Sequence, residues 1–161
     1  MKIVIDIRCL TQKNRTGVGE YTYELLDALF ENDNIHEYFL FYNSFKDVSD
    51  NIPQWKYDNV HYVVSRWPSK LLNILIWMGI IKLDTFIQKR MGKNNHIDYF
   101  FAPNINFISL TKKTKLLLTV HDLSFEFFKE CYSWRRRMWH WLIQSQKLCR
   151  RAYRIMTPSE S

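Results

Sequence analysis

The stretch KIVIDIR, residues 2–8, leads through TGVGE, residues 16–20, into a segment with helical spacing from Gly19 to Phe30. Its apolar, β-branched middle predicts a buried strand. The apolar residues of the later segment recur at the spacing of an amphipathic helix. Glycines between the two let the backbone approach a ligand closely, and a helix start presents unpaired N–H groups to an anion. The chain therefore opens with a predicted strand, a turn suited to phosphate, and a helix.

A second strand exit with polar residues occurs in KLLLTVHDL, residues 115–123. In open α/β sheets, ligands bind beyond the carboxyl ends of the strands. There His121 is able to bond a hydroxyl or move a proton, and Asp122 is able to orient a loop. The alternative is structural: Asp122 caps the next turn and His121 is half-buried and hydrogen-bonded. Asp6 and Arg8 leave the same choice open, between lining a site and pairing structurally.

Further strands and helices alternate along the chain. We expect strands at 37–42, 60–65, 97–102, 115–120 and 154–157, helices at 70–91 and 132–152, and a polar loop at 43–56. Several of the strands are continuous apolar runs, which is typical of a parallel sheet covered on both faces. The sequence therefore predicts one α/β domain over residues 1–161, Rossmann-like and three-layered, with a mostly parallel sheet and helices on both faces.

The formal net charge is +7, and the excess is concentrated near the carboxyl end. Residues 131–159 contain seven Arg or Lys and no acid. Such a patch suits phospholipid heads, nucleotide phosphates or nucleic acid, or it is a solvated helix face. The 70–91 segment is either a core helix or an interfacial membrane helix. The membrane alternative is suggested by Trp77 and the flanking lysines, which suit the headgroup zone.

Several functional classes are disfavoured by what the pattern lacks. The longest apolar stretch, Leu71 to Ile81, is about half of the ~20 residues that span a bilayer. No secretory leader is visible, and the three cysteines are far apart, so we expect a cytoplasmic protein with reduced thiols. The histidines and cysteines show no metal-ligand spacing, so no metal site is expected. A dinucleotide oxidoreductase is disfavoured because the third glycine of its fingerprint is missing.

Five stretches together resemble one family. MKIVIDIRCL followed by RTGVGEYTYELLDAL resembles the opening of GT4-type retaining glycosyltransferases, which have the GT-B fold. The family's fourth-strand exit resembles DYFFAPN (98–104), and its His-Asp segment resembles LLLTVHDLSFEFFKECYSWRRRMWHW (116–141). The strand before a later helix start resembles YRIMTPSES (153–161). The similarity covers essentially the whole chain in the order of the family.

The resemblance implies a role for each matching position. Backbone N–H groups of Gly17, Val18 and Gly19 would lie near the donor diphosphate. His121 would contact the transferred sugar, and Asp122 would support its loop. The acceptor side of the cleft would be bordered by Tyr21, Asn104, Ser159 and Glu160. The family needs no metal ion or bound cofactor, and its donor substrate is a nucleotide-diphosphate sugar.

The family's second, donor-binding domain has no counterpart here, and Ser159 to Ser161 resemble the start of a further helix. We therefore expect the amino-terminal, acceptor-side domain of a hexosyltransferase of cell-surface polysaccharide or lipid-linked glycan synthesis, inactive alone. The expected partners are the nucleotide sugar, a glycan or lipid-linked acceptor, the second domain and an anionic inner membrane face. The competing class is a non-catalytic basic module that binds nucleotides or RNA. The aromatics fall mostly at core-periodic positions, which disfavours stacking on RNA bases.

Overall fold

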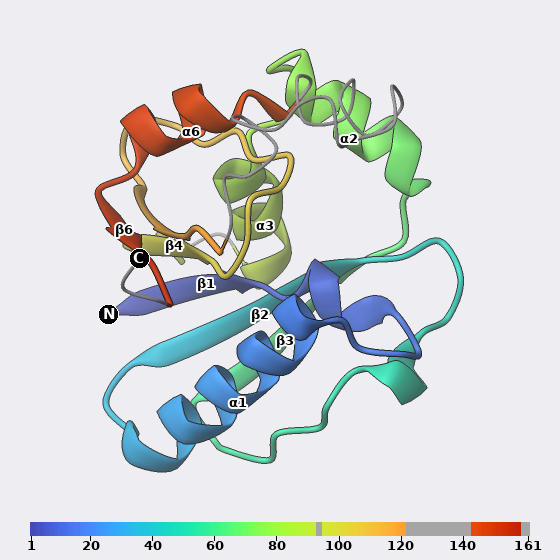
Figure 1. Ribbon diagram of the computed structural model, residues 1–161, viewed down its shortest axis with the longest axis vertical. Helices are drawn as coiled ribbons and strands as arrows, with labels where there is room; N and C mark the ends of the chain where they lie inside the picture. The colour runs from blue at the N-terminus through green and yellow to red at the C-terminus, as the bar shows by residue number, and fades with distance from the viewer. Residues whose placement is uncertain (93–94, 122–142, 159–161) are drawn as a thin grey trace.

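The computed structural model describes residues 1–92, 95–121 and 143–158, and its centre is a six-stranded, all-parallel sheet (Figure 1). The strands are β1 (Lys2–Asp6), β2 (Glu37–Asn43), β3 (Val60–Ser65), β4 (Tyr99–Ala102), β5 (Lys115–Thr119) and β6 (Arg154–Met156). They lie in the order β3-β2-β1-β4-β5-β6. The predicted Rossmann-like α/β class is confirmed, and every described strand pair is parallel.

The order in which the chain adds strands to the sheet reverses at β1. From β1 the chain builds outward through β2 and β3, then returns to pair β4 on the other side of β1. Val4 lies opposite Phe39 of β2 and Phe100 of β4. The chain that follows β1 leads to β2 on one side, and the chain that follows β4 leads to β5 on the other side. The carboxyl ends of β1 and β4 therefore form a switch point, where folds of this kind place their ligands.

One face of the sheet is covered by α1 (Gly17–Asn32). Leu26 and Phe30 of this helix pack on Ile5 of β1 and Leu40 of β2, and all four are fully or nearly fully buried. Leu25 and Leu29 pack against the edge of the same cluster. The helical spacing that predicted α1 is therefore the spacing of its core contacts.

The opposite face is covered by α2 (Ser69–Trp77), α3 (Leu83–Met91) and α6 (Ser145–Arg151). Their buried side chains meet Val4, Phe41 and Phe100 from the other side of the strands. Alternate residues of β2 thus face different cores, because successive side chains of a strand point to opposite faces. This two-sided burial explains the continuous apolar run EYFLFY.

The single helix predicted over residues 70–91 is wrong, because it is two helices. The break follows Trp77, and Gly79 adopts a φ of 73°. The N–H groups of Ile80 and Ile81 both donate to the carbonyl of Leu75, which turns the chain before α3 begins. Only glycine adopts this left-handed backbone without strain.

The predicted 132–152 helix is also wrong as one continuous element. Its first half lies outside the described residues. Within them, α6 begins only at Ser145, because Gln144 adopts a φ of 54°.

Several predicted element ends shift by a few residues. β1 ends at Asp6 rather than at residue 8, where a 3-10 turn (η1, Arg8–Thr11) starts, and α1 begins at Gly17 rather than at Gly19. The loop after β2 contains a 3-10 turn (η2, Ser49–Asn51). No helix within the described residues has the length and apolar character that crossing a bilayer requires.

Candidate functional site

The start of α1 lies beyond the carboxyl end of β1. Thr16 is the N-cap residue in an extended conformation, and its Oγ1 accepts from the Gly19 N–H at 3.4 Å. The Thr16 carbonyl accepts from Glu20 N–H at 2.9 Å. Among the described residues, the N–H groups of Gly17 and Val18 have no acceptor. Two backbone donors at the positive end of the helix dipole are therefore available to an anion.

The two glycines of this turn differ in their surroundings. Among the described residues, no heavy atom lies within 4 Å of a Cβ atom built on Gly17, so none of them fills the space beside it. A Cβ on Gly19 would lie 3.3 Å from the Arg15 Cβ and 3.7 Å from the Cys9 carbonyl oxygen. Gly19 therefore allows α1 to pack closely on the turn before it, and Gly17 alone borders open space.

His121 follows β5 and is half-buried at the same edge of the sheet. Its Nε2 lies 2.7 Å from the carbonyl oxygen of Pro103, the residue after β4. Because a carbonyl only accepts, Nε2 carries the proton, and in the neutral ring Nδ1 is the acceptor. No partner of Nδ1 lies among the described residues. This nitrogen is therefore the one able to contact a substrate hydroxyl.

Tyr21 connects α1, which follows β1, with His121, which follows β5. Its ring meets the His121 ring edge-on, with centroids 4.7 Å apart. Because Tyr21 lies four residues after Gly17, the two share one face of α1. Asn104 follows Pro103 directly and is half-buried. The structure thus places Gly17, Tyr21, Asn104 and His121 at the same edge of the sheet.

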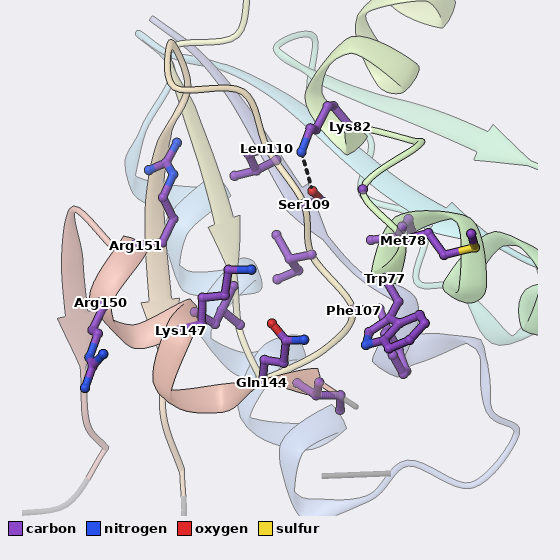
Figure 2. A pocket seen from close by; sticks show the side chains of 15 residues that line it. Trp77, Met78, Lys82, Phe107, Ser109, Leu110, Gln144, Lys147, Arg150 and Arg151 are labelled. Atoms are coloured by element: carbon purple, nitrogen blue, oxygen red, sulfur yellow. Dashed lines mark hydrogen bonds between the residues drawn. The ribbon is translucent and has the colours of Figure 1, made fainter. Parts of the chain in front are cut away.

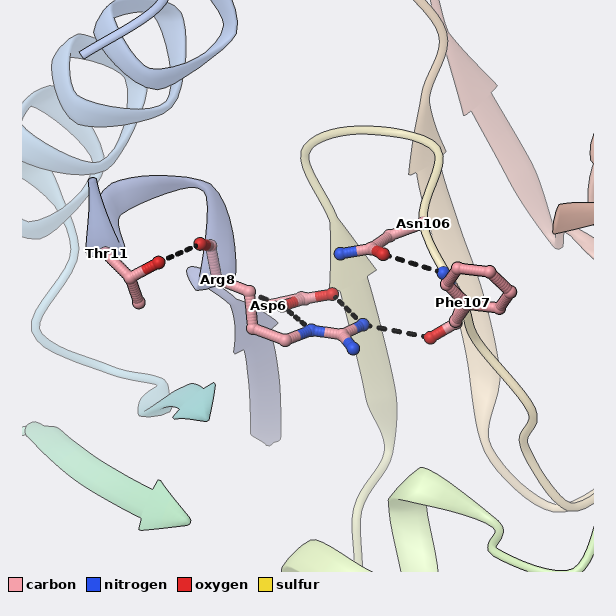
Figure 3. Close-up of polar contacts among 5 residues, drawn as sticks. All are labelled: Asp6, Arg8, Thr11, Asn106 and Phe107. Carbon is pink, nitrogen blue, oxygen red and sulfur yellow. Dashed lines mark hydrogen bonds and ion pairs between the residues drawn. The ribbon is translucent and has the colours of Figure 1, made fainter. Parts of the chain in front are cut away.

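Asp6 and Arg8 form a buried ion pair between β1 and the connection after β4 (Figure 3). Arg8 Nε donates to Asp6 Oδ1 at 2.8 Å, and one terminal nitrogen donates to Asp6 Oδ2 at 2.6 Å. The same nitrogen donates to the Phe107 carbonyl at 2.9 Å. Both side chains are thus satisfied, so of the two choices that the sequence left open the contacts favour structural pairing.

A thiol also lies behind the α1 turn. Burial raises the pKa of Cys9 to about 11, and its Sγ lies 3.5 Å from Thr22 Oγ1. A thiol with this pKa stays protonated at neutral pH and is a poor nucleophile. Cys9 therefore serves packing in this region.

Two residues at this edge were missed by the sequence analysis. Thr119 is fully buried at the end of β5, two residues before His121, and its Oγ1 has no hydrogen-bond partner within the described part of the chain. In the sequence, Thr119 could have been noticed as a hydroxyl residue at the end of an apolar run. Arg15 precedes the helix, pairs with Glu20 at 3.5 Å and covers the Tyr23 ring at 4.1 Å. It brings a cation close to the first turn of α1.

Three predicted site residues, Asp122, Ser159 and Glu160, lie outside the described residues. In the part of the chain that is described, no three His, Cys, Asp or Glu side chains gather as a metal site would require. Comparison of the chain with protein-family models, curated proteins and solved structures gave no match.

Proposed function

We propose that this chain is the amino-terminal, acceptor-side domain of a retaining glycosyltransferase with the GT-B architecture. The domain forms one wall of a cleft in which a sugar passes from a nucleotide diphosphate to a hydroxyl. The proposal rests on the resemblance of the ordered motifs and on one geometric observation. His121 is held by the Pro103 carbonyl against Tyr21, one helical turn from the open Gly17.

This arrangement suits the charge changes of sugar transfer. The leaving diphosphate gains negative charge, and fixed N–H donors at a helix start stabilise it without reorganising. Gly17 and Val18 supply such donors, and the missing side chain of Gly17 lets a phosphate approach. His121 presents Nδ1 as an acceptor to a sugar hydroxyl, and its hydrogen bond to Pro103 orients the ring.

A second domain is required for transfer by this mechanism. In a GT-B enzyme it holds most of the nucleotide sugar, and closure of the two domains excludes water. This chain alone therefore binds a donor weakly and does not turn it over. The donor sugar, its nucleotide and the acceptor are properties of the complete enzyme.

The test is a sugar-transfer assay on the complete gene product that carries this domain, with a panel of nucleotide sugars. We expect His121→Ala to lower kcat by ~100-fold or more, the usual scale for a positioned polar group. The matched control is His61→Ala, which removes an exposed histidine of β3 away from this edge. An unchanged rate for His121→Ala, or an equal loss in the control, would remove His121 from the proposed site.

A further inference from the structure

The helix α2 is apolar on both of its sides. Leu72 and Ile76 point into the core and are almost fully buried. Ile74 is 53% exposed and Met78 is 59% exposed. The exposed group, which we term the α2 apolar face, comprises Leu71, Ile74 and Trp77 of α2 with Met78 and Ile80 of the turn that follows it. Single exposed apolar residues are ordinary, but five within ten residues mark an interaction surface.

A pocket of about 520 Å³ lies beside this face, between α2, α6 and the connection after β4 (Figure 2). Trp77, Met78 and Phe107 form part of its apolar wall. Lys147 and Arg150 line it from α6. Apolar side chains and Lys147 therefore lie around one hollow, and Arg150 points outward beside it (Figure 2).

The charges of the pocket are unbalanced. Four of its lining residues are Lys or Arg, and none is acidic. Two of the four already have partners, since Lys82 donates to Ser109 Oγ at 3.0 Å and Arg151 donates to the Thr111 and Thr114 carbonyls. Lys147 and Arg150 have no hydrogen-bond or ion-pair partner among the described residues. These two cations are available to an anion.

We propose that the α2 apolar face and this pocket form a docking site for an anionic phospholipid bilayer. The α2 apolar face enters the boundary between headgroups and acyl chains, where tryptophan is favoured. Lys147 and Arg150 attract the lipid phosphates, as cations beside a membrane surface do. The charge of the pocket selects an anionic membrane over an uncharged apolar partner. This inference does not depend on sugar transfer, because docking is measured without a donor or an acceptor.

The experiment is sedimentation of this chain with vesicles of phosphatidylcholine alone and of phosphatidylcholine with phosphatidylglycerol. We expect binding to the anionic vesicles that weakens strongly at high salt, and little binding to phosphatidylcholine alone. Lys147→Glu with Arg150→Glu should weaken binding about 30-fold or more. Ile74→Ser with Met78→Ser should weaken it about 10-fold, by removing buried apolar area.

Two matched double variants serve as controls. Lys46→Glu with Lys56→Glu changes the net charge equally, on the exposed β2–β3 connection. Ile35→Ser with Phe45→Ser removes exposed apolar groups away from α2. Both should bind anionic vesicles like the parent chain. Circular dichroism establishes the fold of each variant, and a double variant that fails to fold is replaced by its two single substitutions.

Three outcomes would overturn the proposal. The first is absence of binding to the phosphatidylglycerol vesicles. The second is an equal loss in the controls, which would show attraction by net charge alone. The third is binding to a single-stranded RNA without binding to vesicles, which would assign the cations to a nucleic acid.

Discussion

Replacement of glycine by alanine should change the stability of the protein differently at two positions, Gly79 and Gly17. Gly79 has a φ of 73°, whereas Gly17 is the first residue of α1 with open space where a Cβ would lie. We expect Gly79→Ala to lower the free energy of unfolding by about 1–2 kcal/mol, the cost of left-handed backbone. Gly17→Ala should be neutral or raise it by roughly 0.5 kcal/mol, since it restricts the unfolded chain. Urea denaturation of both variants measures the difference.

The space around Gly79 excludes a steric clash as the cause of a loss of stability in Gly79→Ala. Of the described residues, a Cβ on Gly79 would meet only Lys82, whose ammonium lies at 3.7 Å, which is an ordinary contact. A loss of stability in Gly79→Ala therefore reports backbone strain rather than a clash. Equal stability changes in Gly17→Ala and Gly79→Ala would contradict this account.

At the same scale, the sequence predicted where polar side chains leave the sheet but not what they contact. An apolar run ending in His121 and a glycine turn after β1 both mark carboxyl ends of strands, which share an edge when the strands are parallel. The contact of His121 with the Pro103 carbonyl depends on β4 and β5 being neighbours. Strand order follows from the packing of the whole sheet, so this partner could not be predicted locally.

Among the elements, the connection from α1 to β2 carries an acid-sensitive contact. Asp33 ends α1 and accepts from Tyr38 Oη at 2.7 Å and from the Ile35 N–H at 2.8 Å. The bond from Tyr38 is the largest cause that lowers the pKa of Asp33 below its ordinary value, and the Ile35 bond adds to it. A folded pKa below the unfolded value of ~3.9 gives stability that is present above that value and lost as pH falls below about 4.

We therefore expect Asp33→Asn to be less stable than the parent at neutral pH and to lose less stability on acidification. The two stability curves should approach each other as the pH falls below about 4, because the unfolded parent then takes up a proton that the folded parent binds only at a lower pH. Urea midpoints measured between pH 7 and about pH 3 check this expectation. The control is Asp58→Asn, which removes an exposed carboxyl with no hydrogen-bond or ion-pair partner among the described residues. Parallel curves for the parent and Asp33→Asn would contradict the assignment.

The existence of elements could be predicted better than their interruptions. Spacing identified α1 because Leu25, Leu26, Leu29 and Phe30 all face one core. The same spacing runs through 70–91, yet Gly79 and the turn onto the Leu75 carbonyl divide it into α2 and α3. The break at Gln144 left no signal, because glutamine is not a residue that favours a left-handed backbone.

Across the whole molecule, the sheet order sets which backbone is best protected. β1 lies between β2 and β4, with cores on both of its faces, and Val4 and Ile5 are fully buried. β6 is the last described strand, pairs only with β5, and all three of its residues are exposed. Side-chain burial and the number of neighbouring strands therefore both decrease from β1 at the centre to β6 at this edge.

Local opening should follow that gradient, because amide exchange is fast where few apolar contacts must break. We expect the amides of β1 and β2 to exchange at least roughly 100-fold more slowly than those of β6. β3 lies at the opposite edge, but Val60, Val63 and Ser65 are buried, so it should fall between the two. Hydrogen exchange followed by mass spectrometry or NMR at neutral pH measures the order. Exchange in β6 as slow as in β1 would show that this edge is covered by a contact beyond those of β5.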